Sequence, residues 1–129
     1  MKVEIMNFFA IAIGGSIGAL LRYWVSQIVN NNIVVNSFPI GTLLVNASGC
    51  FIGGIIIGGL ASKFSSETKS FVVIGILGSY TTFSSFGMET INLIQDDKIK
   101  SALIYIASTF ILTLTGVILG YIISKKIFN

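Results

Sequence analysis

The segment that decides the fold is Gly75-Ile-Leu-Gly78-Ser-Tyr-Thr81-Thr-Phe83-Ser-Ser-Phe86-Gly-Met-Glu89. Glycines and hydroxyl side chains fill its centre, although no charge separates Lys69 from Glu89 and the stretch is long enough to enter a membrane. Glycine, serine and β-branched threonine form helices less readily than alanine or leucine. We therefore predict a membrane helix that is interrupted near residues 78–81. An interruption at membrane depth requires that neighbouring protein or an ion satisfies the freed backbone groups.

The composition of the whole chain also indicates a membrane protein. Of its 129 residues 53% are hydrophobic and 10% are charged, and the mean hydropathy is +0.91. A soluble domain carries roughly 25% charged residues, so eight basic and five acidic side chains cannot cover a water-facing surface. The absence of histidine excludes histidine-based acid–base catalysis and pH switches. The lysines are scattered rather than clustered, which argues against nucleic-acid binding.

Four apolar stretches are predicted to cross the membrane as helices. A spanning helix needs about 20 mostly apolar residues. The stretches that meet this requirement are residues 8–28, 39–61, 71–94 and 101–124. The connections between them are short and polar, so consecutive helices must run in opposite directions. We therefore expect residues 1–129 to form a single four-helix transmembrane domain.

The distribution of basic residues indicates only a weak preference for one orientation. With four spans, the N-terminus, the 62–70 connection and the C-terminus lie on one side of the membrane. The basic residues of that side are Lys2, Lys63, Lys69, Lys125 and Lys126, and those nearer the other side are Arg22, Lys98 and Lys100. Lysine and arginine favour the cytoplasmic side. The pattern agrees with cytoplasmic termini and equally with a protein that inserts in both orientations.

Glycines inside the spans predict close helix packing. Four pairs are spaced at i, i+4: Gly14 and Gly18, Gly49 and Gly53, Gly54 and Gly58, and Gly116 and Gly120. Small residues at this spacing let helix backbones touch in lipid, where no hydrophobic force drives helices together. Ordinary bundle packing is one interpretation. The other is a dimer, because four tightly packed helices leave little room for a path inside one protomer and place any conduit between protomers.

Polar residues within the spans have a structural and a functional interpretation. Asn46 lies near the middle of the second span, where its amide either joins two helices or offers its NH₂ group to a passing anion. In the fourth span, Tyr105, Thr109 and Thr113 are spaced four residues apart, and their hydroxyls either bond their own backbone or line a polar path. Hydrogen-bond donors without a membrane-centred cation relay suit a small anion better than a cation.

Two aromatic side chains and two charged ones add to this set. Phe83 and Phe86 are three residues apart and share a helix face, where they are either apolar filler or aromatic edges that face a path. Glu89 and Arg22 are expected near the ends of their spans, where they extend toward water or form pairs.

Three segments resemble the Fluc fluoride channels, also called the CrcB family. They are Gly14-Gly-Ser-Ile-Gly-Ala-Leu-Leu-Arg22-Tyr, Gly41-Thr-Leu-Leu-Val-Asn46-Ala-Ser-Gly-Cys-Phe and Gly78-Ser-Tyr-Thr-Thr-Phe-Ser-Ser-Phe86. They occur in the family's order on three of the four predicted spans, and the chain length and number of spans agree as well. The family usually has threonine where Ser85 stands, a difference that keeps the hydroxyl group.

The resemblance implies an all-α antiparallel, dual-topology homodimer in the cell membrane of a bacterium. Two pores along the protomer interface would export fluoride passively from the cytoplasm and so relieve fluoride toxicity. A structural Na⁺ at the dimer centre would be held by the backbone carbonyl groups of Gly78 and Thr81 from both protomers. Fluoride, a second copy of the chain and membrane lipid would then be its partners.

The resemblance also implies roles for individual residues in the fluoride pathway. Asn46 would be the pore amide, and Phe83 and Phe86 would be the aromatic pair that lines the path. Ser84 and Ser85 would be neighbouring hydroxyl donors, and which of them faces the pore stays open. The remaining assignments are Arg22 near a vestibule and a polar track of Tyr105, Thr109 and Thr113.

Two other functions remain open from the sequence. A small four-helix multidrug exporter is also an antiparallel dimer, but its proton-coupled transport depends on a glutamate inside the first span, where this chain has none. A non-transporting subunit of a larger complex is the second alternative. An enzyme is not expected, because the sequence offers no nucleophile–base pair or metal cluster.

Overall fold

The computed structural model describes residues 2–33 and 38–128, and every regular element in these ranges is helical. The elements are α1 (Lys2–Asn32), α2 (Ile40–Ile55), η1 (Ile56–Leu60), η2 (Ala61–Lys63), α3 (Ser66–Lys69), η3 (Ser70–Leu77), α4 (Gly78–Tyr80), α5 (Phe83–Gln95) and α6 (Ile99–Phe128). They form four helices long and apolar enough to cross a membrane: Glu4–Asn32, Ile40–Lys63, Ser66–Gln95 and Ile99–Phe128. The prediction of four spanning helices is confirmed, and each is longer than predicted.

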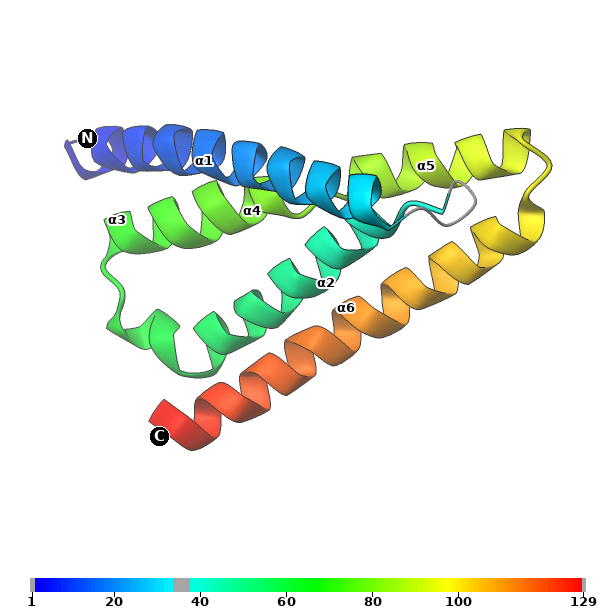
Figure 1. Cartoon of the computed structure of the whole chain (residues 1–129). Coiled ribbons are helices and arrows are strands. Elements are labelled where there is room, and N and C mark those ends of the chain that lie inside the picture. The colour runs from blue at the N-terminus through cyan, green and yellow to red at the C-terminus, as the bar shows by residue number, and fades with distance from the viewer. Residues whose placement is uncertain (1, 34–37, 129) are drawn as a thin grey trace.

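The closest helix pairs are not consecutive in the chain. The helix α1 packs along η3 and α4, and α2 packs along α6. Figure 1 shows that the members of each pair run in the same direction, because one helix of opposite direction lies between them in the sequence. The start of α1, the connection before α3 and the end of α6 lie at one end, and the α5–α6 turn lies at the other (Figure 1).

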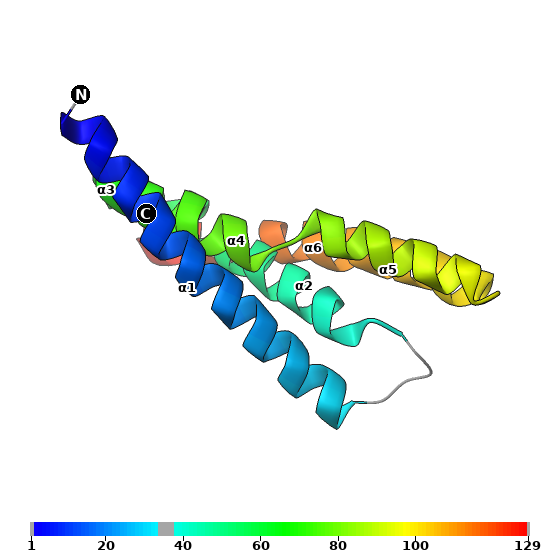
Figure 2. The ribbon, with the colours of Figure 1, turned by 90° about the horizontal axis from the view of Figure 1, so that it is seen from above.

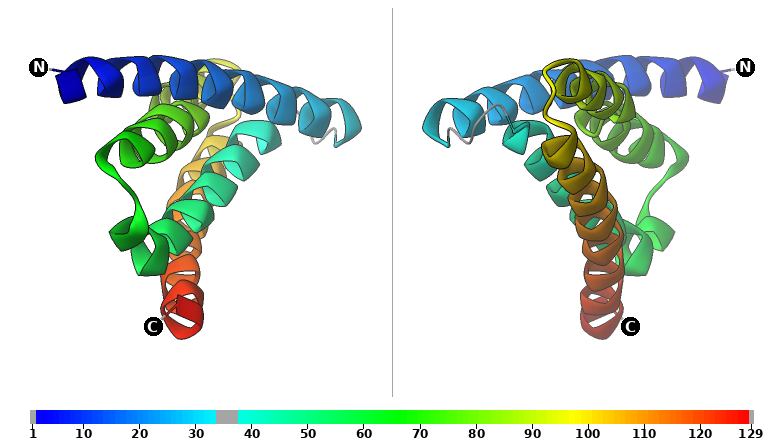
Figure 3. Two further views of the ribbon diagram at one scale, coloured as in Figure 1. Left: turned by 90° about the vertical axis from the view of Figure 1, so that its left-hand side faces the viewer. Right: turned by 90° about the vertical axis from the view of Figure 1, so that its right-hand side faces the viewer.

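The helices spread apart rather than surround a central core. Figure 2 shows α5 diverging from α1 after α4, and Figure 3 shows α6 extending away from α1. Large apolar side chains are correspondingly exposed, for example Phe8 at 73% and Trp24 at 61%. In a bilayer these side chains face lipid tails or another protein, so their exposure costs little.

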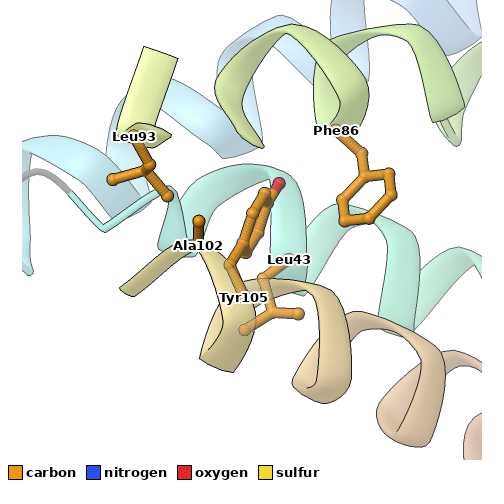
Figure 4. Packing of buried hydrophobic residues seen from close by; sticks show 5 residues of the cluster. All are labelled: Leu43, Phe86, Leu93, Ala102 and Tyr105. Atoms are coloured by element: carbon orange, nitrogen blue, oxygen red, sulfur yellow. The ribbon is translucent and has the colours of Figure 1, made fainter. Parts of the chain in front are cut away.

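A small apolar cluster joins α2, α5 and α6. Its members are Leu43, Phe86, Leu93, Ala102 and Tyr105 (Figure 4). The side chain of Tyr105 is completely buried, and its ring packs against Phe86 with the centroids 5.2 Å apart. The cluster therefore fixes α5 against α6 in the part of the molecule where α5 has separated from α1.

The glycine pairs lie at the tightest helix contacts, as their spacing predicts. A Cβ atom added at Gly18 would overlap the carbonyl group of Ile76, and one added at Gly54 would overlap that of Val117. On α6, an added Cβ at Gly120 would overlap the carbonyl oxygen of Phe51. Glycine therefore occupies positions where any larger side chain would push α1 away from η3, or α2 away from α6.

Side-chain hydrogen bonds tie the ends of α2 to other helices. At its start, the backbone N–H of Gly41 donates to Asn30 Oδ1 on α1 over 3.0 Å. At its end, the hydroxyl of the buried residue Ser124 on α6 donates to the carbonyl oxygen of Ile55 over 2.6 Å, next to the π-helical turn η1. Helix ends leave backbone groups without intrahelical partners, and these bonds satisfy some of them inside the membrane protein.

We expect the substitution Gly120→Ala to destabilise the protein by about 1–3 kcal/mol, because an extra methyl group forces closely packed backbones apart. Gly87→Ala is the matched control, since no atom lies within 4 Å of a Cβ at that position. This control should gain about 0.5–1 kcal/mol from the better helix propensity of alanine. Thermal unfolding in detergent, followed by circular dichroism, measures both. Equal midpoints for the two variants would contradict the packing described.

Candidate functional site

Two consecutive extended residues lie at the centre of the third span. Thr81 has φ −76° and ψ 153°, and Thr82 has φ −149° and ψ 123°. Gly78 keeps helical dihedrals (φ −63°, ψ −29°), so the non-helical residues lie at and just beyond the end of the segment where the sequence predicts an interruption. Threonine accepts this conformation readily because its β-branched side chain favours extended backbone.

The side chain of Asn46 holds the extended backbone of Thr82 by two hydrogen bonds. Its Nδ2 donates to the Thr82 carbonyl oxygen over 2.9 Å, and its Oδ1 accepts the Thr82 N–H over 2.8 Å. Asn46 is buried in α2, with 7% of its surface exposed. The structural interpretation of Asn46 as a link between helices therefore applies. An amide carries two N–H groups, so one of them remains for a further acceptor beside this clamp.

The clamp changes which backbone groups are satisfied in the third span. In a continuous helix the N–H of Thr82 would donate to the carbonyl of Gly78, and the N–H of Ser85 to that of Thr81. Here the first N–H donates to Asn46, and the second donates to the hydroxyl oxygen of Thr82 over 3.2 Å. The carbonyl oxygens of Gly78 and Thr81 thus lose their helical donors. Carbonyl oxygen is a ligand type that hard cations accept.

Side-chain clusters do not offer an alternative metal site in the part of the chain that the structure describes. Residues 2–33 and 38–128 contain no group of three or more cysteine, aspartate or glutamate side chains that could hold a metal ion.

A pocket of about 220 Å³ lies next to the clamp, between α2, α5 and α6. Its walls are formed by Asn46, Cys50, Thr81, Thr82, Phe83, Phe86, Thr109, Phe110 and Thr113. The structure thus brings together residues of three spans that the sequence analysis assigned to an anion pathway.

The two phenylalanines meet in the pocket but have different environments. Their ring centroids are 5.4 Å apart, yet Phe86 is 6% exposed and Phe83 is 76% exposed. Phe86 is held by edge contact with Phe110, at 6.2 Å and an interplanar angle of 90°, and by the ring of Tyr105. One ring is therefore fixed by this protomer, whereas the other has few neighbours within it.

Thr109 carries a buried hydroxyl group without a partner. The residue is 8% exposed and its Oγ1 makes no hydrogen bond within the described chain, although it lies at the pocket wall. The neighbouring hydroxyl of Thr113 behaves differently, because it donates to the backbone carbonyl of Thr109 over 2.7 Å. Buried polar groups are almost always hydrogen-bonded. An unpaired hydroxyl at a pocket wall therefore indicates a place for a ligand.

The hydroxyl of Tyr105 belongs to a second polar cluster, which the sequence analysis missed. It donates to Glu89 Oε2 over 2.7 Å, and the hydroxyl of Thr42 donates to Glu89 Oε1 over 2.7 Å. Glu89 is therefore paired with two neutral donors inside the bundle rather than with a cation. Thr42 and Asn46 are four residues apart, as are Tyr105 and Thr109, so each pair lies on one helix face. This spacing did not show which face meets Glu89.

Ser84, Ser85 and Arg22 do not line the pocket. The hydroxyls of both serines lie within hydrogen-bond distance of Thr82 Oγ1, at 3.2 Å for Ser84 and 3.1 Å for Ser85. They therefore surround the residue that caps the start of α5. Arg22 is half-buried on α1, and it forms no hydrogen bond or ion pair with any residue that the structure describes.

Comparison with known proteins gives one consistent result. A family model described as CrcB-like protein, Camphor Resistance (CrcB), matches residues 9–121. The chain is 41% identical over 126 residues to a protein of Helicobacter pylori (strain HPAG1) named fluoride-specific ion channel FluC, with 94% of this chain and 96% of the relative covered. A protein of the same name from Ruminiclostridium cellulolyticum is 39% identical, with 96% of both chains covered.

We expect Asn46→Ala to destabilise the protein strongly, because it leaves both polar groups of the Thr82 backbone buried without partners, at about 1–3 kcal/mol each. Ser48→Ala is a suitable control. Ser48 lies two residues after Asn46 on the same helix, and its hydroxyl bonds Tyr80 at an exposed position. Chemical or thermal unfolding in detergent should show a large loss for the first variant and little change for the second. A variant Asn46→Ala as stable as the wild type would contradict the clamp.

Proposed function

Since the chain belongs to the CrcB family, we propose that it is a passive, fluoride-selective channel that releases fluoride from the cytoplasm and relieves fluoride toxicity. It is a multi-pass protein of a bacterial membrane and not an enzyme, as its family and its four span-length helices indicate. The observation that carries the proposal is the unpaired hydroxyl of Thr109, which lies in a pocket with an amide and aromatic rings.

The pocket offers what a dehydrated anion needs. Moving even a carboxylate-sized ion into low dielectric costs of order 20 kcal/mol in the idealised limit, and fluoride is smaller. The hydroxyl of Thr109 and the remaining N–H of Asn46 replace part of the lost hydration. The edges of Phe83 and Phe86 are electropositive and attract an anion weakly. Weak sites in series let the ion enter and also leave.

The pathway continues from Thr109 along the fourth span to Tyr105. The hydroxyl of Tyr105 is fixed by Glu89, which also holds Thr42. A carboxylate repels an anion, and the hydroxyls of Tyr105 and Thr42 each give their single O–H to Glu89, so Glu89 holds this end of the track in place without contacting fluoride. Towards the other end, Thr113 extends the polar track along the wall of the pocket.

A second copy of the chain completes the pathway. Phe83 is largely exposed on the protomer, and the pocket that it borders is only partly enclosed. We propose that a partner inserted in the opposite orientation covers this face, which yields two pores at the interface of a dual-topology homodimer. The weak bias of the basic residues supports such insertion. In this dimer, Ser84 and Ser85 add hydroxyl donors near the path, and Arg22 lies near a vestibule.

The residues present fit a structural Na⁺ at the dimer centre. The carbonyl oxygens of Gly78 and Thr81 have lost their helical donors to the Asn46 clamp and to the cap of α5. Two such oxygens from each protomer would supply four ligands for the ion. When bound, Na⁺ would supply positive charge that stabilises these carbonyls and links the third spans of both protomers.

Fluoride efflux from liposomes tests the function directly. Purified protein is reconstituted into vesicles loaded with potassium fluoride, valinomycin is added, and an electrode records fluoride release, with chloride-loaded vesicles as the control. Rapid release of fluoride with little release of chloride is expected. Accumulation driven by a pH gradient would indicate an exporter instead, and a folded protein without any flux would indicate a subunit of a larger complex.

In this assay we expect Thr109→Val to lower the fluoride flux tenfold to a hundredfold, because a hydrogen bond to a charged group contributes about 1.5–3 kcal/mol. Its folding stability should not fall, since the hydroxyl has no partner in the protein to lose. Thr90→Val is the matched control: Thr90 is equally buried, at 8% exposure, and its hydroxyl bonds only the carbonyl of Phe86. Flux that is reduced equally in both variants would remove Thr109 from the pathway.

Exchange of Na⁺ for a large organic cation at equal ionic strength should lower the thermal midpoint of the protein in detergent. The freed carbonyl groups of Gly78 and Thr81 would then lack their ligand. K⁺ and Li⁺ at the same concentration are the controls, because they show whether the effect depends on the size of the cation. Identical unfolding curves in all four salts would count against a bound Na⁺.

A further inference from the structure

The side chain of Cys50 lies at the wall of the pocket through which the proposed pathway runs. Cys50 follows Asn46 by one turn of α2, is half-buried, and forms part of the same pocket wall. It is the one cysteine of the sequence. Its neighbours around the pocket include Phe83 and Thr113.

A second observation, made on another residue of this pocket, points to a ligand there. The hydroxyl of Thr109 is more than nine-tenths buried, lines the same pocket and has no hydrogen-bond partner in the described chain. An apolar cavity of this kind would stay dry, whereas a polar one with free donors takes up water or an ion. The remaining N–H of Asn46 provides another donor one turn from Cys50.

We propose that Cys50 forms the wall of the anion pathway directly beyond Asn46, and that its thiol is a modification site through which small thiol-directed reagents block the channel. The effect on flux rests on the proposed function, whereas the accessibility of the thiol to water does not. A thiol is only a weak hydrogen-bond donor. Cys50 therefore contributes space to the path rather than solvation, and a larger group at this position closes it.

The chemistry of modification reports whether the pocket contains water. The thiolate is the nucleophile, and it forms readily only where water reaches the sulfur. With methyl methanethiosulfonate, the thiolate attacks the sulfenyl sulfur of the reagent. A disulfide bond to a methylthio group forms, the bond between the two reagent sulfurs breaks, methanesulfinate leaves and the thiol proton goes to water. The thiol is oxidised to the disulfide, and the thiosulfonate is reduced to the sulfinate.

The wild-type protein can be used directly in the test, because Cys50 is the one cysteine of its sequence. Liposomes containing it are treated with methyl methanethiosulfonate, labelling is quantified by mass spectrometry, and fluoride efflux is measured on the same sample. We expect labelling of Cys50, at least a tenfold loss of flux, and recovery after reduction with dithiothreitol. The flux through Cys50→Ser, whatever its value before treatment, should not change when the reagent is added.

A lipid-facing cysteine provides the matched control. The double variant Cys50→Ser/Leu119→Cys carries its thiol on α6 at a position that is 49% exposed and outside the pocket. It should react at least tenfold more slowly than the wild type, and its flux should not change when it is labelled. Equal labelling rates for the two thiols would overturn the inference that Cys50 faces water.

Three further outcomes would overturn the proposal. Complete labelling of Cys50 with unchanged flux would place the thiol outside the pathway, while the channel function itself would stand. Absence of labelling in liposomes, with full labelling of the same protein in sodium dodecyl sulfate, would show that the pocket is closed to water. If the untreated protein releases no fluoride at all, the proposed function fails first and the role of Cys50 in a fluoride pathway fails with it.

Discussion

Two hydrogen bonds between the side chain of Asn46 and the backbone of Thr82 make the rest of the arrangement possible. Inside a bilayer every backbone polar group needs a partner from the protein, so a helix cannot simply stop at membrane depth. The amide of Asn46 replaces the partners that Thr82 would have in a helix. Two extended residues can then follow α4, and α5 turns away from α1 to pack on α6, as Figure 2 shows.

The same change of direction produces both features on which the proposed function depends. Where α5 departs from α1, a pocket remains between α2, α5 and α6, and its walls carry the amide, the rings and the hydroxyl of Thr109. The clamp takes the helical donor of the Gly78 carbonyl, and the Thr82 cap takes that of the Thr81 carbonyl. Two neighbouring polar side chains, Asn46 and Thr82, thus account for the two carbonyls on which the proposed cation site depends.

The sequence was sufficient for the four span-length helices, because each depends on local composition. Uninterrupted apolar stretches predict spans, and glycines at i, i+4 predict the contacts that Gly18 and Gly120 make. The Glu89 cluster was not predictable in this way, since its hydrogen bonds join three helices whose rotation about their axes depends on packing. For Asn46 the sequence left two interpretations open, and geometry was needed to show that one amide serves Thr82 and still borders the pocket.

Some hydroxyl groups within the spans bond their own helix, and their contrast with that of Thr109 carries the functional argument. Those of Thr90, Ser108 and Thr113 donate to backbone carbonyls three or four residues earlier, so they need nothing from outside the helix. Thr109 lies on the same helix as two of them, yet its hydroxyl is buried without a partner. Helix propensity gives no reason for a threonine there, and leaving its hydroxyl unpaired opposes folding. The proposed pathway gives this hydroxyl a partner, because an anion in the pocket would accept its hydrogen bond.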